Sequence, residues 1–326
     1  MYSISGVNEH MKICILMYTL NGVNYLGEQL QSIFKQDIYD KAEISILVRD
    51  DGSTDRTTDI LDRYQNDGKL TWFSGEALGK TKAYWELIEK AGDADYYALC
   101  EQDDVWYPEK LSRAVKYLET KAIIDGEETE VSKRAMLYLS GYTVTNAKLK
   151  PMSFRRNPSN KYTDFEHSLV FSSMPGCTYV FNGAARENLL KYDTKMHYTP
   201  NYENLVRNII FITGTVVFDR VTTVYWRRTR PDKQGPMYQG GLLGHIKMML
   251  ELYTGKVKNE RSKMAAALLE VFKDELDESV KAEPLKQLSG YIEDAITRER
   301  LLQNHKFATG SFPDKWFKSA VKGNKL

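Results

Sequence analysis

The stretch EISILVRDDGSTDRTTDIL (Glu43–Leu61) decides the fold class. Its apolar run Glu43–Arg49 suits a buried strand, a polar turn follows, and Ile60, Leu61 and Tyr64 then lie on one face of an expected helix. The same alternation recurs along the first third of the chain. The further strands expected there are Lys12–Tyr18, Leu70–Phe73 and Asp95–Cys100. This pattern predicts an α/β fold with a mostly parallel central sheet and helices on both faces.

Polar clusters follow three of these expected strands, at Thr19–Gly22, Asp50–Asp55 and Glu101–Asp104. The carboxyl ends of parallel strands meet at one edge of a sheet, and open α/β folds bind ligands there. We therefore expect one binding site built from all three clusters. The chain has neither a GxGxxG dinucleotide fingerprint nor a GxxxxGK[ST] P-loop, which argues against classical dehydrogenases and P-loop enzymes.

The composition is that of a globular protein without a charge bias. Among 326 residues, 45 Lys and Arg stand against 44 Asp and Glu, so the formal net charge is +1. This balance argues against a nucleic-acid binder, which would be clearly basic. The cysteines Cys14, Cys100 and Cys177 are too far apart for a disulfide framework or a paired zinc motif. We expect buried, reduced thiols in a cytoplasmic protein.

The acidic turn EQDDVW carries the strongest chemical signal. Glu101, Asp103 and Asp104 crowd carboxylates at a strand end, where they repel one another unless a cation lies between them. Hard oxygen ligands suit Mg²⁺ or Mn²⁺ that bridges to phosphates. The alternative is an acidic helix N-terminus favoured by the helix dipole.

Two further segments carry polar groups that suit a nucleotide. Asp50 and Asp51 could accept hydrogen bonds from a ribose hydroxyl or a base N–H, although a turn and helix cap explains them equally. In GKTKAYW, Lys80 and Lys82 could meet a diphosphate, and solvated helix lysines are the alternative.

The runs MYTLNGVNYLGEQLQSI, VRDDGSTDRTTDIL and ALCEQDDVWYPEKL together resemble the donor half of family 2 glycosyltransferases with the GT-A fold. The resemblance covers about residues 11–119 and is closest to the rhamnosyltransferase-like branch of bacterial polysaccharide biosynthesis. It implies inverting transfer of a sugar from a nucleoside diphosphate sugar, usually with a divalent cation, Mg²⁺ or Mn²⁺. The implied donor is dTDP-rhamnose, with UDP-sugars as the main competitor.

The resemblance implies roles for individual residues of the donor half. Those implied to bind the nucleotide sugar are Thr19, Asn21, Asp50, Asp51, Lys82 and Asp104. Asp50 matches the carboxylate that reads the base, Asp51 lies near the ribose, and Lys82 stands where a basic residue faces the nucleotide. In the metal motif, Asp103 is the implied direct ligand and Glu101 the second, with Glu where that branch usually has Asp.

The resemblance continues into PGCTYVFN (Pro175–Asn182) and to the catalytic base. Counting back from Gly214 places Tyr202 and Glu203 in the slot of a family His-Asp pair, so Glu203 is the implied general base, which deprotonates the acceptor hydroxyl. His197 is a competitor whose register fits less well. An exposed glutamate at a helix start is the alternative interpretation of Glu203.

Counting forward from Gly214 reaches YWRRTR, where the family often has a histidine that completes the metal shell. Thr229 occupies that slot. Arg227, Arg228 and Arg230 are instead expected to neutralise the departing diphosphate, because cations stabilise such a leaving group. The alternative is a solvated basic patch.

The predicted organisation is a GT-A domain over residues 11–235 and a helical C-terminal extension over 236–326. The domain divides into a nucleotide-sugar half (11–119) and an acceptor half (120–235). In the acceptor half we expect strands at Leu137–Val144 and Cys177–Asn182, and a change from helix to strand at Gly214. In the extension, LLGHIKMMLELY and RSKMAAALLEVFKDEL have the apolar spacing of helices.

The tail Phe312–Leu326 combines four lysines with aromatic side chains, which suits an anionic membrane surface and a glycan or lipid-linked acceptor. A helix packed on the body of the protein explains the tail equally. We expect a cytoplasmic enzyme, peripheral on the membrane; the oligomeric state stays open.

Two other functions compete with an active glycosyltransferase. The departures at Glu101, Glu203 and Thr229 are compatible with a catalytically weak or inactive homologue that serves as a nucleotide-sugar-binding partner subunit. A nucleotidyltransferase also uses a nucleotide-binding α/β sheet. It would show a Gly-rich, Arg/Lys-containing loop directly after the first strand, where this chain has YTLNGVN.

Overall fold

The computed structural model describes residues 11–124, 134–156, 164–170, 174–197, 201–229, 259–304, 307 and 311–323. The chain forms two compact units. The first comprises residues 1–159, 174–192 and 201–227, and the second comprises 160–173, 193–200 and 228–326. The expected boundary at residue 235 lies outside the described residues and stays a prediction.

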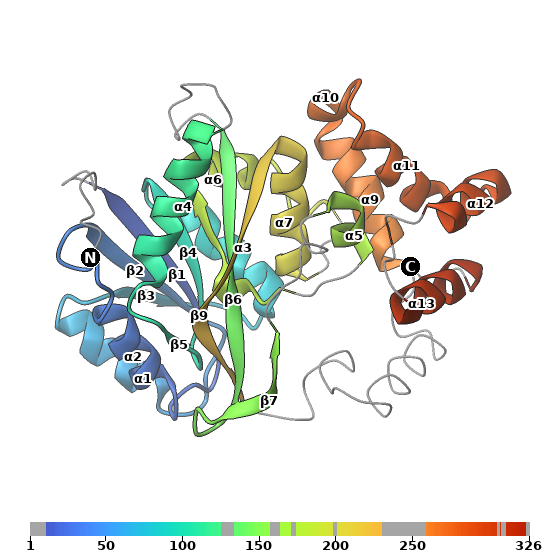
Figure 1. The fold of residues 1–326 in the computed structure, drawn as a ribbon. Helices are drawn as coiled ribbons and strands as arrows, with labels where there is room; N and C mark the ends of the chain where they lie inside the picture. Colours follow the sequence, from blue (N-terminus) through green and yellow to red (C-terminus); the bar gives the residue numbers. More distant parts are fainter. Residues whose placement is uncertain are drawn as a thin grey trace. The chain divides into compact units, whose positions relative to one another are not determined.

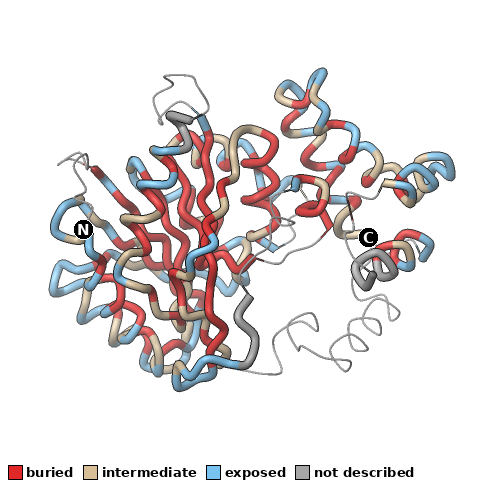
Figure 2. Tube along the Cα trace, in the orientation of Figure 1, coloured by how far each residue is buried: buried red, intermediate tan, exposed pale blue. Residues whose placement is uncertain are grey.

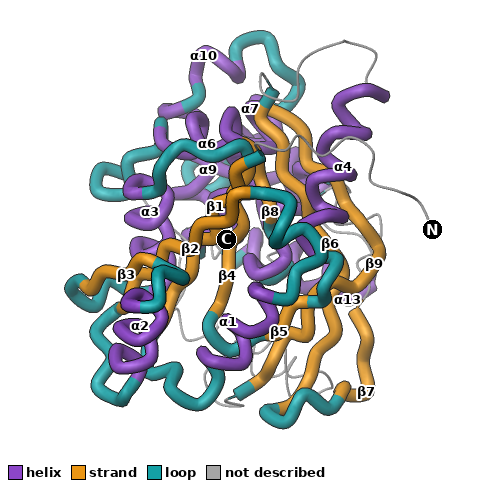
Figure 3. The backbone as a smooth tube through the Cα atoms, turned by 90° about the vertical axis from the view of Figure 1, so that its left-hand side faces the viewer, coloured by secondary structure: helices purple, strands orange, loops and turns teal. Residues whose placement is uncertain are grey.

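A nine-stranded sheet in the order β3-β2-β1-β4-β8-β6-β9-β5, with β7 paired to β6, forms the centre of the first unit (Figures 1 and 3). Its strands are β1 (Lys12–Thr19), β2 (Glu43–Asp50), β3 (Thr71–Ser74), β4 (Tyr96–Glu101), β5 (Val105–Trp106), β6 (Ala135–Asn146), β7 (Pro151–Arg156), β8 (Val180–Asn182) and β9 (Gly214–Arg228). Strands β1 to β4 are parallel, which confirms the predicted alternation. The pairs β4–β8, β6–β8, β6–β7 and β5–β9 are antiparallel.

Helices cover both faces of this sheet, as Figure 1 shows. The helices of the first unit are α1 (Leu26–Phe34), α2 (Thr57–Asn66), α3 (Lys80–Lys90), α4 (Lys110–Ile124), α6 (Gly183–Leu190) and α7 (Tyr202–Thr213). Helices α3, α6 and α7 pack against one another on one face, and α4 packs on β6 from the other. The buried residues follow the strands and the inward faces of these helices (Figure 2).

The parallel register brings the polar strand ends together. Thr19 at the end of β1 pairs with Asp50 at the end of β2, and Tyr18 pairs with Glu101 at the end of β4. Strands β1 and β4 are buried along most of their length, which is typical of a sheet covered on both faces. The three polar clusters therefore meet at one edge, as the sequence predicts.

The acceptor half follows its predicted pattern with one change. The expected strand Cys177–Asn182 begins with a short 3₁₀ turn, Gly176–Thr178, and only β8 is extended. The expected switch from helix to strand occurs at Gly214, where α7 ends and β9 begins. A Cβ atom on Gly214 would lie 1.9 Å from the carbonyl oxygen of Ala135, so the close approach of the start of β9 to the start of β6 requires glycine here.

The second unit is helical over its described residues. It contains α5 (Phe165–Val170), α9 (Glu260–Val271), α10 (Lys273–Leu276), α11 (Ala282–Gly290), α12 (Ala295–Gln303) and α13 (Ser311–Lys322). Of the expected helices, α9 and α10 are confirmed, whereas the segment LLGHIKMMLELY lies outside the described residues. No helix among the described residues has the length and apolar character needed to cross a membrane.

The described part of the tail packs within the second unit. Phe317 of α13 is buried, and its ring stacks on that of Phe307 at 5.6 Å between centroids. Ala320 and Val321 are buried as well. Phe317 is therefore withdrawn from the aromatic surface expected for membrane contact. The side chains of Phe312 and Trp316 lie outside the described residues.

We expect Gly214→Ala to destabilise the protein by about 3 kcal/mol, because the new methyl group meets backbone that must move. Gly27→Ala in α1 is the matched control: nothing lies within 4 Å of its added Cβ, and alanine favours a helix by about 0.5 to 1 kcal/mol. Urea unfolding of both variants measures the difference. If the two variants were equally stable, the close approach of Gly214 to the Ala135 backbone would not require glycine.

Candidate active site

The loop after β1 joins the other two polar loops. Asn21 adopts a left-handed conformation with φ 51°, and its side-chain oxygen accepts a hydrogen bond from the Thr54 N–H at 2.8 Å. The N–H of Asn21 donates to the Ser53 hydroxyl at 2.8 Å. The N–H of Gly22 donates to the Thr57 hydroxyl at 2.8 Å. The main contacts of Asn21 thus hold the DGSTD turn in place, and its role in nucleotide binding stays a prediction.

Gln102 connects the same loop to the acidic motif. Its side-chain amide accepts from the Leu20 N–H at 3.0 Å and donates to the Leu20 carbonyl at 2.8 Å. A Cβ atom on Gly22 would lie 2.0 Å from the Gln102 Oε1 atom, so this contact requires glycine in the loop. Sequence reasoning missed Gln102, because only the topology brings residues 82 positions apart together.

The carboxylate of Asp50 is buried and shapes its own turn. One oxygen accepts from the hydroxyls of Thr19 at 3.0 Å and Ser53 at 2.5 Å. The other accepts from the N–H groups of Ser53 at 2.8 Å and Gly52 at 3.2 Å. Gly52 has φ 90°, a conformation that favours glycine. The turn interpretation therefore has direct support, and base reading by Asp50 stays a prediction.

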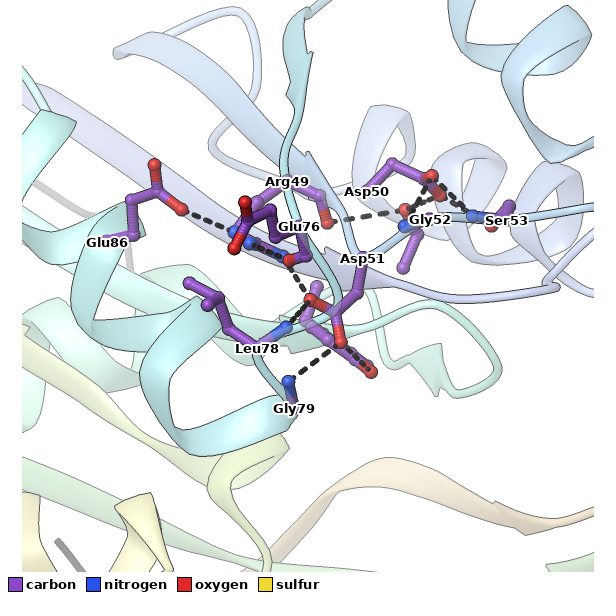
Figure 4. A network of polar contacts seen from close by, with 11 residues as sticks. Arg49, Asp50, Asp51, Gly52, Ser53, Glu76, Leu78, Gly79 and Glu86 are labelled. Atoms are coloured by element: carbon purple, nitrogen blue, oxygen red, sulfur yellow. Dashed lines mark hydrogen bonds and ion pairs between the residues drawn. The ribbon is translucent and has the colours of Figure 1, made fainter.

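Asp51 belongs to a buried ionic network around Arg49 (Figure 4). The guanidinium of Arg49 is removed from solvent and pairs with Asp51, with Glu86 at 2.6 Å and with the carbonyl of Glu76 at 2.8 Å. The carboxylate of Asp51 also accepts from the N–H groups of Leu78 at 2.9 Å and Gly79 at 3.0 Å. This network fixes the segment that leads into α3. An arginine at the end of an apolar strand was the overlooked sequence signal.

Lys80, the first residue of α3, reaches the acidic motif. Its ammonium lies 2.7 Å from the Glu101 Oε2 atom. Burial acts to lower the pKa of Lys80, but the charges of Glu101, Glu203 and Asp103 outweigh it and raise the pKa above its usual value. Lys80 therefore stays charged and faces three carboxylates. Lys82, the predicted nucleotide-facing lysine, has an exposed side chain on α3, and its role stays a prediction.

The first residues of α7 complete this group. The Tyr202 hydroxyl donates to the Glu101 Oε1 atom at 3.0 Å, and Glu203 follows in the first turn of the helix. Glu203 is half-buried. Burial raises the pKa of Glu203 to about 7, with Lys80 opposing the shift and Glu101 adding to it. The structure thus brings the predicted residues Glu101, Asp103 and Glu203 around Lys80.

Asp104 is the fully buried carboxylate of the acidic turn. One of its oxygens accepts from the Arg227 N–H on β9 at 3.0 Å. Burial and the neighbouring charges of Asp103 and Glu101 raise the pKa of Asp104 well above its usual value. The observed contacts attach the turn to β9, and binding of the donor by Asp104 stays a prediction.

The predicted arginines differ in their surroundings. The guanidinium of Arg227 is buried, pairs with Glu28 of α1 and donates to the carbonyl of Ala147 at 2.9 Å. Its charge is therefore already balanced within the protein. Arg228 is half-buried at the last position of β9, followed by Thr229. Arg230 lies outside the described residues.

Two other predictions have a structural outcome. His197 lies 3.8 Å from Glu270 in the second unit, whereas Glu203 belongs to the first. The thiols of Cys14, Cys100 and Cys177 are free and buried, as expected.

The acidic group has the charge to attract a further cation. Three carboxylates, those of Glu101, Asp103 and Glu203, act on the single ammonium of Lys80, which leaves an excess of negative charge. Among the described residues, no cluster of three or more His, Cys, Asp or Glu side chains has the arrangement of a metal site. A divalent cation would thus need ligands from elsewhere, such as phosphate oxygens, besides a carboxylate of this motif.

Solved structures identify the fold. The Staphylococcus aureus TarS 1-349 structure in complex with UDP has a TM-score of 0.53 at 16% identity, covering 96% of this chain and 90% of that one. The mannosyltransferase PcManGT of Pyrobaculum calidifontis, in complex with GDP-Man and Mn²⁺, has a TM-score of 0.50 at 15% identity, covering 96% and 85%. These similarities confirm the predicted GT-A glycosyltransferase fold.

Sequence comparison relates nearly half of the chain to one family. Residues 14–169 match the model of glycosyl transferase family 2. A dTDP-rhamnosyl transferase, RfbG of Shigella flexneri, is 29% identical over 189 residues, which are 54% of this chain and 56% of RfbG. The poly(ribitol-phosphate) β-N-acetylglucosaminyltransferase TarS of Staphylococcus aureus is 29% identical over 171 residues, 52% of this chain and 27% of TarS.

Residues 14–169 therefore match glycosyltransferase family 2, in agreement with the prediction from the motifs. The matches span at most 56% of the length of the first three curated relatives.

We expect Arg49→Met to destabilise the protein by about 3 to 5 kcal/mol, because the carboxylates of Asp51 and Glu86 lose their buried counter-charge. Arg56→Met removes an exposed pair with Asp59 and should cost less than about 1 kcal/mol. Denaturant unfolding compares the two. If both variants were equally stable, the buried network would not support the loop before α3.

Proposed function

We propose that the chain is an inverting glycosyltransferase that moves a sugar from a nucleoside diphosphate sugar to a hydroxyl of a glycan or lipid-linked acceptor in cell-surface polysaccharide synthesis. The observation that carries the proposal is the meeting of Glu203, Lys80 and the acidic motif at the carboxyl ends of the parallel strands. Nucleotide-sugar sites of open α/β sheets lie at this edge. The match to family 2 and the fold of UDP-bound TarS support it.

Glu203 is the proposed general base. Its ionised carboxylate accepts the proton of the acceptor hydroxyl while that oxygen forms a bond to the anomeric carbon of the donor sugar. The bond between this carbon and the diphosphate oxygen breaks on the opposite side, so the configuration inverts and the nucleoside diphosphate leaves with the electron pair. The half-buried position of Glu203 supports this role, because a pKa of about 7 gives a carboxylate enough basicity near neutral pH.

Positive charge must compensate the departing diphosphate. Lys80 is the first candidate for this positive charge, because its ammonium contacts Glu101 of the acidic motif. Arg228 at the end of β9 is the second candidate. Asp103 would hold Mg²⁺ or Mn²⁺, which would supply further positive charge beside the diphosphate. The PcManGT structure, solved in complex with Mn²⁺, supports a divalent cation.

The nucleotide is proposed to lie over the first two loops, near Thr19, Asn21, Asp50 and Asp51. Exposed leucines border these loops: Leu20 follows β1 and is 36% exposed, and Leu78 precedes α3 and is 41% exposed. Binding becomes more favourable when an aromatic base covers such apolar surface and removes it from water. dTDP-rhamnose is the first donor to test because RfbG is a dTDP-rhamnosyl transferase, and UDP-GlcNAc is the second because TarS is solved with it.

A cytoplasmic location with peripheral membrane contact belongs to this proposal. It rests on the charge of the tail Phe312–Leu326, which has four lysines and one aspartate. Phe317 adds nothing to such a contact, since its side chain is buried within the second unit.

The function is tested by screening nucleotide sugars for thermal stabilisation, followed by transfer assays with Mn²⁺. A bound donor raises the melting temperature because it binds only the folded chain. Asp103→Ala should lower transfer about a hundredfold or more, since the transition state loses charge stabilisation. Donor binding without transfer to any acceptor would favour the nucleotide-sugar-binding partner subunit, and no binding at all would contradict both functions.

The general base is tested by the pH dependence of turnover. Protonated Glu203 accepts no proton, so kcat/KM should rise with pH through a midpoint near 7, the raised pKa of this carboxyl in the free enzyme. Glu203→Gln should lower kcat about a hundredfold or more while the Kd for the nucleoside diphosphate stays within about twofold. A Glu203→Gln variant with normal kcat would show that the carboxylate has only a structural role.

A further inference from the structure

Glu101 accepts hydrogen bonds from two helices that are far apart in the sequence. The Oε2 atom accepts from the Lys80 ammonium of α3 at 2.7 Å, and the Oε1 atom accepts from the Tyr202 hydroxyl of α7 at 3.0 Å. Each carboxylate oxygen therefore already has a donor. The side chain at the end of β4 joins the start of α3 to the start of α7.

The partner ring is held from several sides. Tyr202 is buried and stacks on Tyr84 with 4.2 Å between ring centroids. The Tyr84 hydroxyl in turn donates to the carbonyl of Cys100, the residue before Glu101, at 2.6 Å. On another side, a Cβ atom added to Gly176 would lie 2.3 Å from the Tyr202 ring. Because packing on Tyr84 and Gly176 holds the ring in place, its contact with β4 depends on the length of the residue at position 101.

We propose that Glu101 is a positioning residue, not a metal ligand: through its hydrogen bond from Tyr202 it fixes the start of α7 and thereby the place of Glu203. This inference rests on the proposed function, because it assigns a task within the same site. Tyr202 and Glu203 are adjacent at the first two positions of α7, so a displacement of the ring moves the backbone that carries the base. Small displacements of a catalytic group reduce turnover strongly.

The charge beside Glu101 supports the same assignment. An ammonium 2.7 Å from one of its oxygens repels a second cation at that oxygen. Asp103 is the other carboxylate of the motif that acts on Lys80, and its side chain is half-buried. Both oxygens of Glu101 thus bind protein groups, and Asp103 is the proposed cation ligand of the motif.

Reach distinguishes Glu101 from an aspartate at the same place. Aspartate is one methylene shorter, and the packed Tyr202 ring should not move far enough to restore the hydrogen bond. Glu101→Asp and Tyr202→Phe should therefore break the same hydrogen bond. Variants that remove one shared interaction are not additive, so a double-mutant cycle measures the link directly.

The experiment measures kcat and KM for the donor, and the Mn²⁺ concentration that gives half-maximal rate, for Glu101→Asp, Tyr202→Phe and the double variant. Each single change should lower kcat about tenfold or more, with KM within about threefold. The double variant should be no slower than the slower single variant. The half-maximal Mn²⁺ concentration should stay within about twofold of wild type in all three variants, and rise at least tenfold in Asp103→Asn.

Tyr97→Phe is the matched control. Tyr97 is also a buried tyrosine, in β4, and its hydroxyl donates to the Gly92 carbonyl at 2.8 Å. Losing that hydroxyl should leave kcat unchanged, which separates positioning of the base from a general loss of stability.

Two results would overturn the inference. If the effects of Glu101→Asp and Tyr202→Phe on kcat multiply in the double variant, the two residues act independently. If Glu101→Asp raises the Mn²⁺ requirement as Asp103→Asn does, Glu101 is a metal ligand. A wild-type chain without transfer would instead overturn the proposed function, and calorimetric titration with Mn²⁺ and UDP would then decide the inference: weaker Mn²⁺ binding to Glu101→Asp contradicts it, and unchanged binding supports it.

Discussion

The buried guanidinium of Arg49 requires negatively charged partners, and the contacts that satisfy it fix the loops around Asp51 and before α3. Arg49 is fully buried and takes its partners from the end of β2, from α3 and from the loop between β3 and α3. Breaking such a network leaves charges uncompensated in a medium that solvates them poorly. The segment before α3 is consequently held against Asp51, and helix α3 begins where Lys80 reaches Glu101.

The carboxylates of the candidate site differ in the groups that solvate them. Asp50 and Asp51 are buried, and donors of the protein occupy the oxygens of both. Asp103 and Glu203 are half-buried and face the ammonium of Lys80. The buried pair Asp50 and Asp51 and the half-buried pair Asp103 and Glu203 together concentrate negative charge at one edge of the sheet, although the net charge of the chain is +1.

The sequence was sufficient for the parallel half of the sheet, because apolar strands and helical spacing are local signals. It also located the change from helix to strand at Gly214, where close packing on Ala135 leaves no room for a side chain. The contacts between residues far apart in the sequence could not be predicted from the sequence. The favoured lysine was Lys82, whereas Lys80 reaches the acidic motif, since the loop network determines where α3 begins. Gln102 escaped notice for the same reason: its partner lies 82 residues away.

Departures from a family motif have to be judged together with the residues that they contact. Taken singly, a glutamate at position 101 suggests a weakened site, and Tyr202 merely stands in the slot of the family histidine. In the structure they hydrogen-bond to each other, and the longer acid reaches a ring that Gly176 leaves room for. A shorter acid with the same tyrosine would leave a buried hydroxyl without this acceptor, which costs free energy. The two changes therefore support each other, and they join the donor motif to the helix that carries Glu203.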